Sequence, residues 1–161
     1  IEGGSLNMTI EKINLDHIVE STILNLEQEA LKKSINIESL VDKRIEVLSD
    51  FISLDIIISN YLNNALAYSP NNSKILITAE EVDKKIKLSV KDEGEGIPEN
   101  YKDRVFERFF RVDKGRSLNQ GGTGLGLSIV KNLASTLSCT VGVENLEPKG
   151  ASFWIELNKS T

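Results

Sequence analysis

The segment Gly121-Gly122-Thr123-Gly124-Leu125-Gly126-Leu127 places glycine at every second position and leads directly into the apolar stretch 127–133. Glycine lacks a Cβ atom, so the backbone here can turn sharply and approach a ligand closely. The first N–H groups of a helix have no partner within the helix, and they favour an anion. The segment therefore predicts a helix over 123–137 that begins at a phosphate-binding loop, although a glycine loop without a ligand has the same pattern.

The composition indicates one ordinary globular domain with neither a nucleic-acid nor a membrane partner. The chain has 161 residues, 40% of them hydrophobic, and a chain of this length buries about two-thirds of the surface that its unfolded form exposes. The formal charge of −5, without a dense Lys/Arg block, argues against nucleic acid and against direct contact with an anionic membrane. We expect residues 1–6 to be a linker or an expression remnant and residues 7–161 to form the domain.

The chain has one cysteine and one histidine, which argues against a Cys/His site for a soft metal. Cys139 cannot form an internal disulfide and fits a reducing cytosol, so we interpret it as a small buried residue. His17 lies among apolar residues with no chemical partner nearby, which favours a surface or packing role over catalysis.

The first third of the chain predicts a long helix followed by two short strands. Asn14 or Asp16 can cap a helix that ends before Ser34. The residues that we expect on its apolar side are Ile18, Ile23, Leu26, Ala30 and Leu31. The strand-like pieces 35–40 and 45–47 suggest an edge hairpin.

A second helix, capped by Asp50 and ended by the Ser69-Pro70 pair, carries two stripes of side chains. Its expected buried face consists of Leu54, Ile57, Ile58, Tyr61, Leu62, Ala65 and Leu66. Beside this face, Asn60 and Asn64 lie one turn apart and point the same way. Asparagine in a helix interior costs about 0.6 kcal/mol relative to alanine, so a partly buried pair predicts a compensating contact. Amide oxygens can bind Mg²⁺ together with phosphate oxygens and water; a solvated polar margin is the alternative.

Two alternating stretches, 74–82 and 85–92, predict a central β-hairpin. The second stretch runs into Asp92-Glu93-Gly94-Glu95-Gly96-Ile97-Pro98, where a carboxylate at the end of a strand precedes two glycines. The glycines allow a sharp turn of the chain. Asp92 is placed to accept a hydrogen bond from a ligand amino group, and an ordinary turn hydrogen bond is the alternative.

The segment between this hairpin and the glycine loop is rich in phenylalanine and arginine. A short helix is expected over 101–105, and Phe106-Glu107-Arg108-Phe109-Phe110-Arg111 follows it. Clustered phenylalanines usually pack into a core, whereas the arginines either pair with surface carboxylates or reach a phosphate. The polar segment 112–120 has no apolar period and predicts a mobile lid. Strands are expected over 140–145 and 151–157.

Taken together, the order of these blocks resembles the catalytic ATP-binding domain of bacterial sensor histidine kinases, in the superfamily with gyrase B, Hsp90 and MutL. The matching blocks are Asn60–Ala65 (N box), Asp92–Ile97 and Gly122–Leu127 (glycine boxes), Val105–Val112 (F box) and the final Gly150-Ala151-Ser152-Phe153. The resemblance covers about residues 14–158. It implies an α+β fold, a two-layer α/β sandwich in which three main helices cover one face of a mixed, mainly antiparallel sheet (the Bergerat fold).

The resemblance also implies a role for each matching residue. Asn60 and Asn64 would hold Mg²⁺ and the triphosphate of ATP. Asp92 would read the adenine amino group, with Ser152 in support through water, and Arg111 would face the γ-phosphate. Asn60 and Arg111 are therefore the implied catalytic residues. The other implied ATP-binding residues are Ile97, Leu127 and Phe153 as walls of the adenine, Tyr68 over its open side, and Gly94, Gly96, Arg108, Gly122, Thr123, Gly124, Leu125 and Gly126.

The implied activity is transfer of the γ-phosphoryl group to a histidine on a separate dimerisation domain, for signalling to a response regulator. The implied location is the cytoplasmic part of a membrane-anchored sensor kinase. The hydrolytic members of the superfamily carry Glu where this chain has Asn60, and an amide cannot act as a general base, so an ATPase is disfavoured. The family usually has Lys where this chain has Ala67. A nucleotide-binding scaffold or sensor domain of a degenerate kinase is therefore the alternative, unless Arg108, Lys114 or Arg116 replaces that charge.

Overall fold

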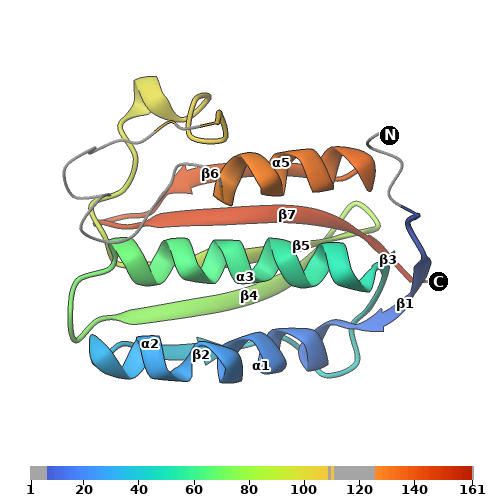
Figure 1. Ribbon diagram of the computed structural model, residues 1–161, viewed down its shortest axis with the longest axis horizontal. Coiled ribbons are helices and arrows are strands. Elements are labelled where there is room, and N and C mark those ends of the chain that lie inside the picture. Colours follow the sequence, from blue (N-terminus) through green and yellow to red (C-terminus); the bar gives the residue numbers. More distant parts are fainter. Residues whose placement is uncertain (1–6, 109, 111–125, 161) are drawn as a thin grey trace.

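The computed structural model describes residues 7–108, 110 and 126–160, which form one sheet with helices packed on one of its faces (Figure 1). The strands are β1 (Ile10–Asn14), β2 (Asn36–Ser39), β3 (Glu46–Asp50), β4 (Lys74–Val82), β5 (Lys85–Lys91), β6 (Thr140–Asn145) and β7 (Ala151–Lys159). The helices are α1 (Leu15–Asn25), α2 (Glu27–Lys32), α3 (Phe51–Tyr68) and α5 (Gly126–Thr136), with a 3-10 turn η1 (Glu99–Tyr101). This two-layer α+β arrangement confirms the fold class expected from the sequence.

The sheet has the strand order β1-β3-β7-β5-β4-β2, and β6 also pairs with β7. Only the β2–β4 pair is parallel; the other pairs formed by the described strands are antiparallel. β7 is the centre of the sheet, because β5 pairs along one of its sides and β6 and β3 share the other. The last strand of the chain therefore holds the two parts of the sheet together.

Helix α3 crosses the middle of the sheet and supplies much of the core. Every residue of its expected apolar face is buried, which confirms the helical pattern. Tyr61 is fully buried, and its hydroxyl donates a hydrogen bond to the Trp154 carbonyl oxygen (2.7 Å). Burial raises the pKa of Tyr61 far above its usual value, so this hydroxyl stays protonated as a donor. The hydrogen bond ties the centre of α3 to β7.

The first turn of α3 is held by Asp50, as the sequence predicted. Its carboxylate accepts hydrogen bonds from the Ser53 backbone N–H (3.0 Å) and hydroxyl (2.8 Å), and from the Thr9 N–H (2.9 Å). The N–H groups of Thr9 and Ser53 hold the pKa of Asp50 below its usual value. Asp50 therefore connects the start of the central helix to the segment before β1.

We expect Asp50→Ala to lower the free energy of unfolding by about 2 kcal/mol at pH 7, because the helix cap and the bond to Thr9 are both lost. A depressed pKa stabilises the fold above the usual value of 3.8, and this contribution disappears as the pH falls through the folded-state pKa. Urea unfolding should therefore show a smaller difference between the two proteins at pH 3 than at pH 7. Asp55→Ala, one turn further along the helix, is the control and should change stability little.

Several predicted elements are confirmed by the structure and others are wrong. The central hairpin, the strands 140–145 and 151–157 and the start of the first helix at Asn14 are confirmed. The edge hairpin is wrong, because β2 pairs with β4 whereas β3 pairs with β1 and β7. The single long helix is wrong as well: it is interrupted at Leu26 between α1 and α2. In place of the helix expected over 101–105, the chain forms the 3-10 helix η1 followed by turns over 102–106.

Two side chains differ from their expected burial, and one strand was not foreseen. Leu31 is 63% exposed rather than on the apolar side, and Cys139 is only partly buried. Strand β1 escaped prediction because most of its side chains are exposed, which leaves no alternating apolar pattern.

The last helix begins at Gly126 within the described residues, so its expected start at Thr123 and the proposed lid over 112–120 lie outside them. No described helix is long and apolar enough to cross a membrane.

Candidate nucleotide-binding site

The packing of α5 against α3 brings Gly126, at the end of the glycine segment, to the side of α3 that carries Asn60 and Asn64. Gly126, the first residue of α5, lies against Asn60: a Cβ atom at Gly126 would be 3.0 Å from Asn60 Oδ1. The Asn60 Nδ2 group donates to the Ile56 carbonyl oxygen (3.0 Å), so Oδ1 faces the start of α5. Asn60 and Asn64 are both half-buried. The structure thus places an amide oxygen of α3 beside the first described residue of α5.

Asp92 forms the other end of the candidate site, where β5 stops. Its carboxylate is 6% exposed, and Oδ1 accepts hydrogen bonds from the backbone N–H groups of Gly94 (2.9 Å) and Ala151 (3.1 Å). Burial raises the pKa of Asp92, and the two hydrogen bonds oppose this effect. Among the described residues no group donates a hydrogen bond to Oδ2. Asp92 therefore makes the turn hydrogen bond that was the alternative interpretation and still has an oxygen atom for a ligand.

The loop that follows Asp92 is fixed from three directions. A Cβ atom at Gly94 would lie 2.7 Å from the Tyr68 carbonyl oxygen, so the loop touches the end of α3. Glu93 Oε1 accepts a hydrogen bond from the Lys74 N–H (2.8 Å) at the start of β4. At the end of β6, the Asn145 side chain hydrogen-bonds the backbone of Ile97. These contacts give this end of the candidate site a defined shape.

Gly150 brings the start of β7 against Asp92. Its backbone φ of +104° is one that residues with a Cβ atom rarely adopt, and a Cβ atom here would lie only 2.0 Å from the Asp92 carbonyl oxygen. The Asp92 N–H also donates to the Ala151 carbonyl oxygen (2.9 Å). The sequence around Gly150 indicated only a turn. Its close contact with Asp92 could not be predicted, because the two residues are far apart in sequence.

The expected walls of the adenine all pack on the common core. Phe153 is 2% exposed, with its ring 5.7 Å from the Tyr61 ring and 6.2 Å from the Phe106 ring. Ile97 and Leu127 are partly buried against the same core. Ser152 is buried on β7 opposite Lys91, the residue before Asp92. The F-box phenylalanine at 106 thus packs into the core, in agreement with the sequence reading.

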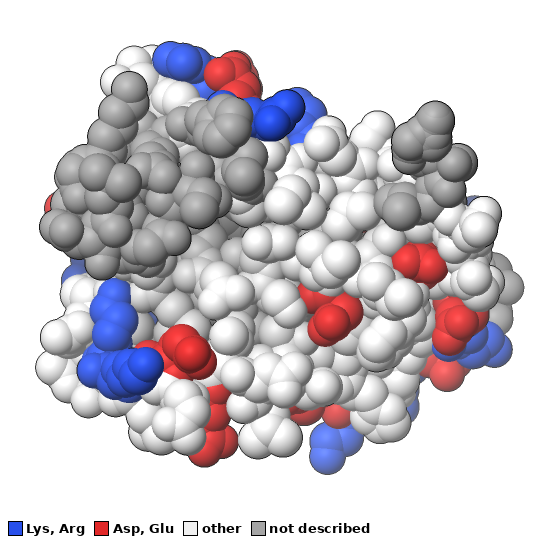
Figure 2. All heavy atoms as spheres, in the orientation of Figure 1, with Lys and Arg blue, Asp and Glu red and all other residues white. Residues whose placement is uncertain are grey.

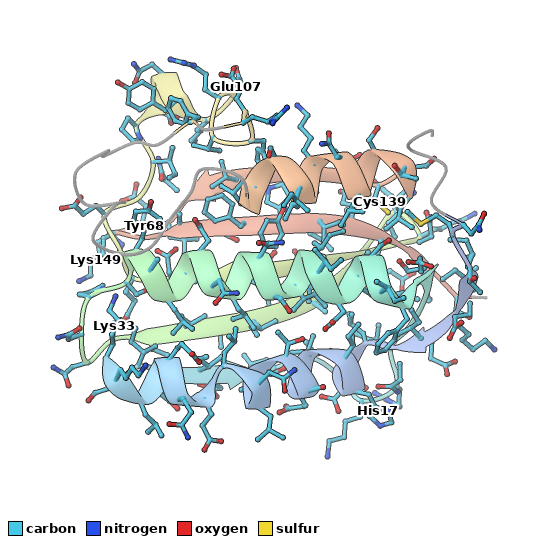
Figure 3. The ribbon with its side chains drawn as sticks, in the orientation of Figure 1. His17, Lys33, Tyr68, Glu107, Cys139 and Lys149 are labelled. Carbon is cyan, nitrogen blue, oxygen red and sulfur yellow. The ribbon has the colours of Figure 1, made fainter. Side chains whose placement is uncertain are left out.

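Not every residue implied in the site can be placed. Arg111, Gly122, Thr123, Gly124 and Leu125 lie outside the described residues. Arg108 is exposed. Tyr68 is half-buried at the end of α3, and Figure 3 shows Lys33 close to that end of the helix. Lys33 Nζ donates to the carbonyl oxygens of Leu66 (2.7 Å) and Ala67 (3.4 Å), which the sequence did not reveal.

The face that carries the site offers few charges to a metal ion. Figure 2 shows a face of mostly uncharged side chains with a few scattered Asp and Glu side chains, and with Lys and Arg side chains at the edges of the view. Among the described residues, no group of three or more His, Cys, Asp or Glu side chains could hold a metal. Amide oxygens such as Asn60 Oδ1 are acceptable ligands of Mg²⁺ when phosphate oxygens and water complete the shell. The donor set therefore fits Mg²⁺ only together with a phosphate ligand.

Comparison with known proteins identifies the family to which this chain belongs. Residues 49–161 match the family described as histidine kinase-, DNA gyrase B- and HSP90-like ATPase. The chain belongs to this family. It is therefore a domain of a nucleotide-using class, and the half-buried Asn60 and Asn64 and the buried Asp92 all lie within the matched residues.

Curated relatives and solved structures agree with this assignment. The chain is 34% identical over 157 residues to the sensor-like histidine kinase SenX3 of Mycolicibacterium smegmatis, covering 98% of this chain and 41% of the relative. It is 37% identical over 123 residues to the sensor histidine kinase WalK of Bacillus subtilis, covering 75% of this chain and 20% of WalK. It thus spans less than half of these relatives. The nucleotide-free catalytic domain of histidine kinase ThkA has a similar fold, with a TM-score of 0.83, 28% identity and coverage of 94% of this chain and 97% of that one.

Proposed function

We propose that this chain is the ATP-binding catalytic domain of a sensor histidine kinase and that it donates the γ-phosphoryl group of ATP to a histidine on a separate domain. The family includes ATPases as well as kinases, so the choice depends on Asn60. This residue is an amide, half-buried, with Oδ1 facing the start of α5. An amide can orient a metal and a phosphate but cannot take a proton from water. Asn60 therefore favours an outside nucleophile over hydrolysis.

We propose that the two ends of the site bind different parts of ATP. Asn60 and Asn64 would hold Mg²⁺ together with the phosphates, while Asp92 Oδ2 would accept a hydrogen bond from the adenine amino group. Mg²⁺ would neutralise charge on the phosphates when bound. The contribution of the protein would be positioning and charge stabilisation rather than proton transfer. The roles of Arg111 and of a lid over 112–120 remain predictions from the sequence.

The nucleophile is proposed to come from a dimerisation domain of the same protein. His17, the only histidine of the chain, is exposed on α1, and Figure 3 shows it far from Tyr68 and the end of α3. It is therefore poorly placed as an acceptor. The histidine kinase ThkA has been solved in complex with the response regulator TrrA, which supports a response regulator as the downstream partner here. We also propose, by analogy with the sensor kinases, that the domain works on the cytoplasmic side of a membrane-anchored protein.

One observation favours a second candidate, a nucleotide-binding scaffold or sensor domain without phosphotransfer. The position three residues after Asn64, which in the family usually carries a phosphate-facing lysine, is the half-buried Ala67 in this chain. A charge-assisted hydrogen bond contributes about 1.5–3 kcal/mol, so ATP would bind about ten- to a hundredfold more weakly without it. The nearby Lys33 already donates to backbone carbonyl oxygens of α3.

The test is autophosphorylation of the full-length protein that carries this chain. With Mg²⁺ and γ-labelled ATP, the expected product is acid-labile, base-stable phosphohistidine, and chelation of Mg²⁺ with EDTA should abolish it. ATP binding in calorimetry with no labelled protein would select the scaffold instead. Steady phosphate release without labelled protein would select an ATPase.

A further inference from the structure

The side chain of Asn145 satisfies both backbone polar groups of Ile97. Asn145 is the last residue of β6; its Oδ1 accepts a hydrogen bond from the Ile97 N–H and its Nδ2 donates to the Ile97 carbonyl oxygen, both at 2.7 Å. One side-chain amide therefore pairs with both the N–H and the carbonyl oxygen of Ile97, as the backbone of a neighbouring strand would. Two short bonds to one residue restrain both its position and its orientation.

The glycine before Ile97 fits closely against the same amide. Gly96 has a φ of +84°, and a Cβ atom on it would lie 2.8 Å from Asn145 Oδ1 and 3.3 Å from the Gly150 carbonyl oxygen. The loop can approach Asn145 this closely only because residue 96 lacks a side chain. The contact is thus a packed one, although Asn145 itself is exposed to solvent.

The turn between β6 and β7 holds the loop of Asp92 at both ends. At one end, the Ala151 N–H donates to Asp92 Oδ1, and the Ala151 carbonyl oxygen accepts from the Asp92 N–H. At the other end, Asn145 holds Ile97. The Leu146 N–H donates to the Gly150 carbonyl oxygen (2.9 Å), which closes the turn that joins these two anchors. Asp92 and Ile97 are therefore fixed relative to each other through one short segment.

We propose that Asn145 is a positioning residue for base recognition: it holds Ile97 at a fixed place relative to Asp92, so that the pocket selects adenine. This inference rests on the proposed function, in which Asp92 reads the adenine amino group and Ile97 walls the ring. A loop that is already ordered loses less conformational freedom when the base binds. A loose Ile97 would accommodate guanine and adenine more equally.

The test measures the affinities of the isolated chain for Mg-ADP and Mg-GDP by calorimetry. Asn145→Leu removes both hydrogen bonds, and Asn145→Asp keeps the acceptor for the Ile97 N–H while placing a negative charge against its carbonyl oxygen. Both variants should bind ADP about three- to tenfold more weakly, as expected from one or two lost hydrogen bonds, and the ADP/GDP affinity ratio should fall. Amide hydrogen exchange of Ile97 should become faster in Asn145→Leu. Thr140→Leu, a polar-to-leucine change at the exposed opposite end of β6, should leave all three quantities unchanged.

The outcomes separate this inference from the function on which it rests. A wild-type chain that does not bind ADP would contradict the proposed function, and the inference with it. A wild-type chain that binds ADP, with Asn145 variants that keep the ADP/GDP ratio, would overturn the inference alone. The same holds if the variants only lower the melting temperature, because a purely structural residue would not change the preference between bases.

Discussion

Asp92→Asn is expected to weaken binding of Mg-ADP about ten- to a hundredfold, because the loss of a hydrogen bond to a charged group costs about 1.5–3 kcal/mol. The asparagine carbonyl oxygen can still accept from the N–H groups of Gly94 and Ala151, as Oδ1 does now. The oxygen that is left for a ligand becomes an NH₂ group, which would meet the adenine amino group donor to donor. Calorimetry with ADP measures the loss. Glu93→Gln, which keeps the acceptor for the Lys74 N–H, is the control and should bind ADP normally.

The same substitution should leave the unliganded domain at least as stable as the wild type. Burial raises the pKa of Asp92, so the folded state holds more protons than the unfolded state above the usual value of 3.8. The free energy of unfolding therefore falls as the pH rises from 3.8 through the raised pKa of Asp92, because ionising a buried carboxylate destabilises the folded state. In the Asp92→Asn variant this side chain cannot ionise, so this pH dependence of stability is lost. Thermal unfolding at pH 4 and pH 7 would show it, and a large loss of stability in Asp92→Asn would mean that Asp92 serves the fold rather than a ligand.

Gly150→Ala is expected to lower the free energy of unfolding by at least about 3 kcal/mol, since it combines a strained backbone with a steric clash. The new Cβ atom would meet the Asp92 carbonyl oxygen at 2.0 Å with φ at +104°. Relief requires that β7 moves away from the loop, and this breaks the hydrogen bond from Ala151 to Asp92. Urea unfolding measures the cost, and ADP binding should fall with it.

Gly142→Ala is the comparison for this change. A Cβ atom there would lie 2.4 Å from the outer ring of Trp154, which is only half-buried. An aromatic side chain at the surface can turn away more easily than a backbone carbonyl group can move. We therefore expect a loss of about 1–2 kcal/mol and normal ADP binding. Equal losses for the two variants would contradict the special role of Gly150.

The parts of the fold that the sequence predicted are those set by local patterns. Helix α3 follows from its apolar repeat and from the cap at Asp50, and the β4–β5 hairpin follows from alternation on both sides of a short turn. The partners of β2 and β3 could not be predicted, because each strand is short and pairs with a segment distant in sequence. Pairing between segments distant in sequence depends on the finished sheet rather than on the residues of the strand itself.

The site divides in the same way. Asn60, Asn64 and Asp92 could be predicted as site residues because each lies in a short motif whose residues are close in sequence. Asn145 escaped notice because its contact with Ile97 joins residues 48 positions apart. An asparagine at the end of a strand, before a turn, is an ordinary feature. No local signal distinguished this one.

The central position of β7 has a consequence for synthesis of the protein. Because β7 lies between β3 and β5, the pair β1–β3 and the group β2–β4–β5 remain unconnected, and β6 has no partner strand, until β7 has been made. Asp92 also lacks its hydrogen bond from Ala151 until that moment. A premature stop before β7 therefore yields a chain that cannot close its sheet.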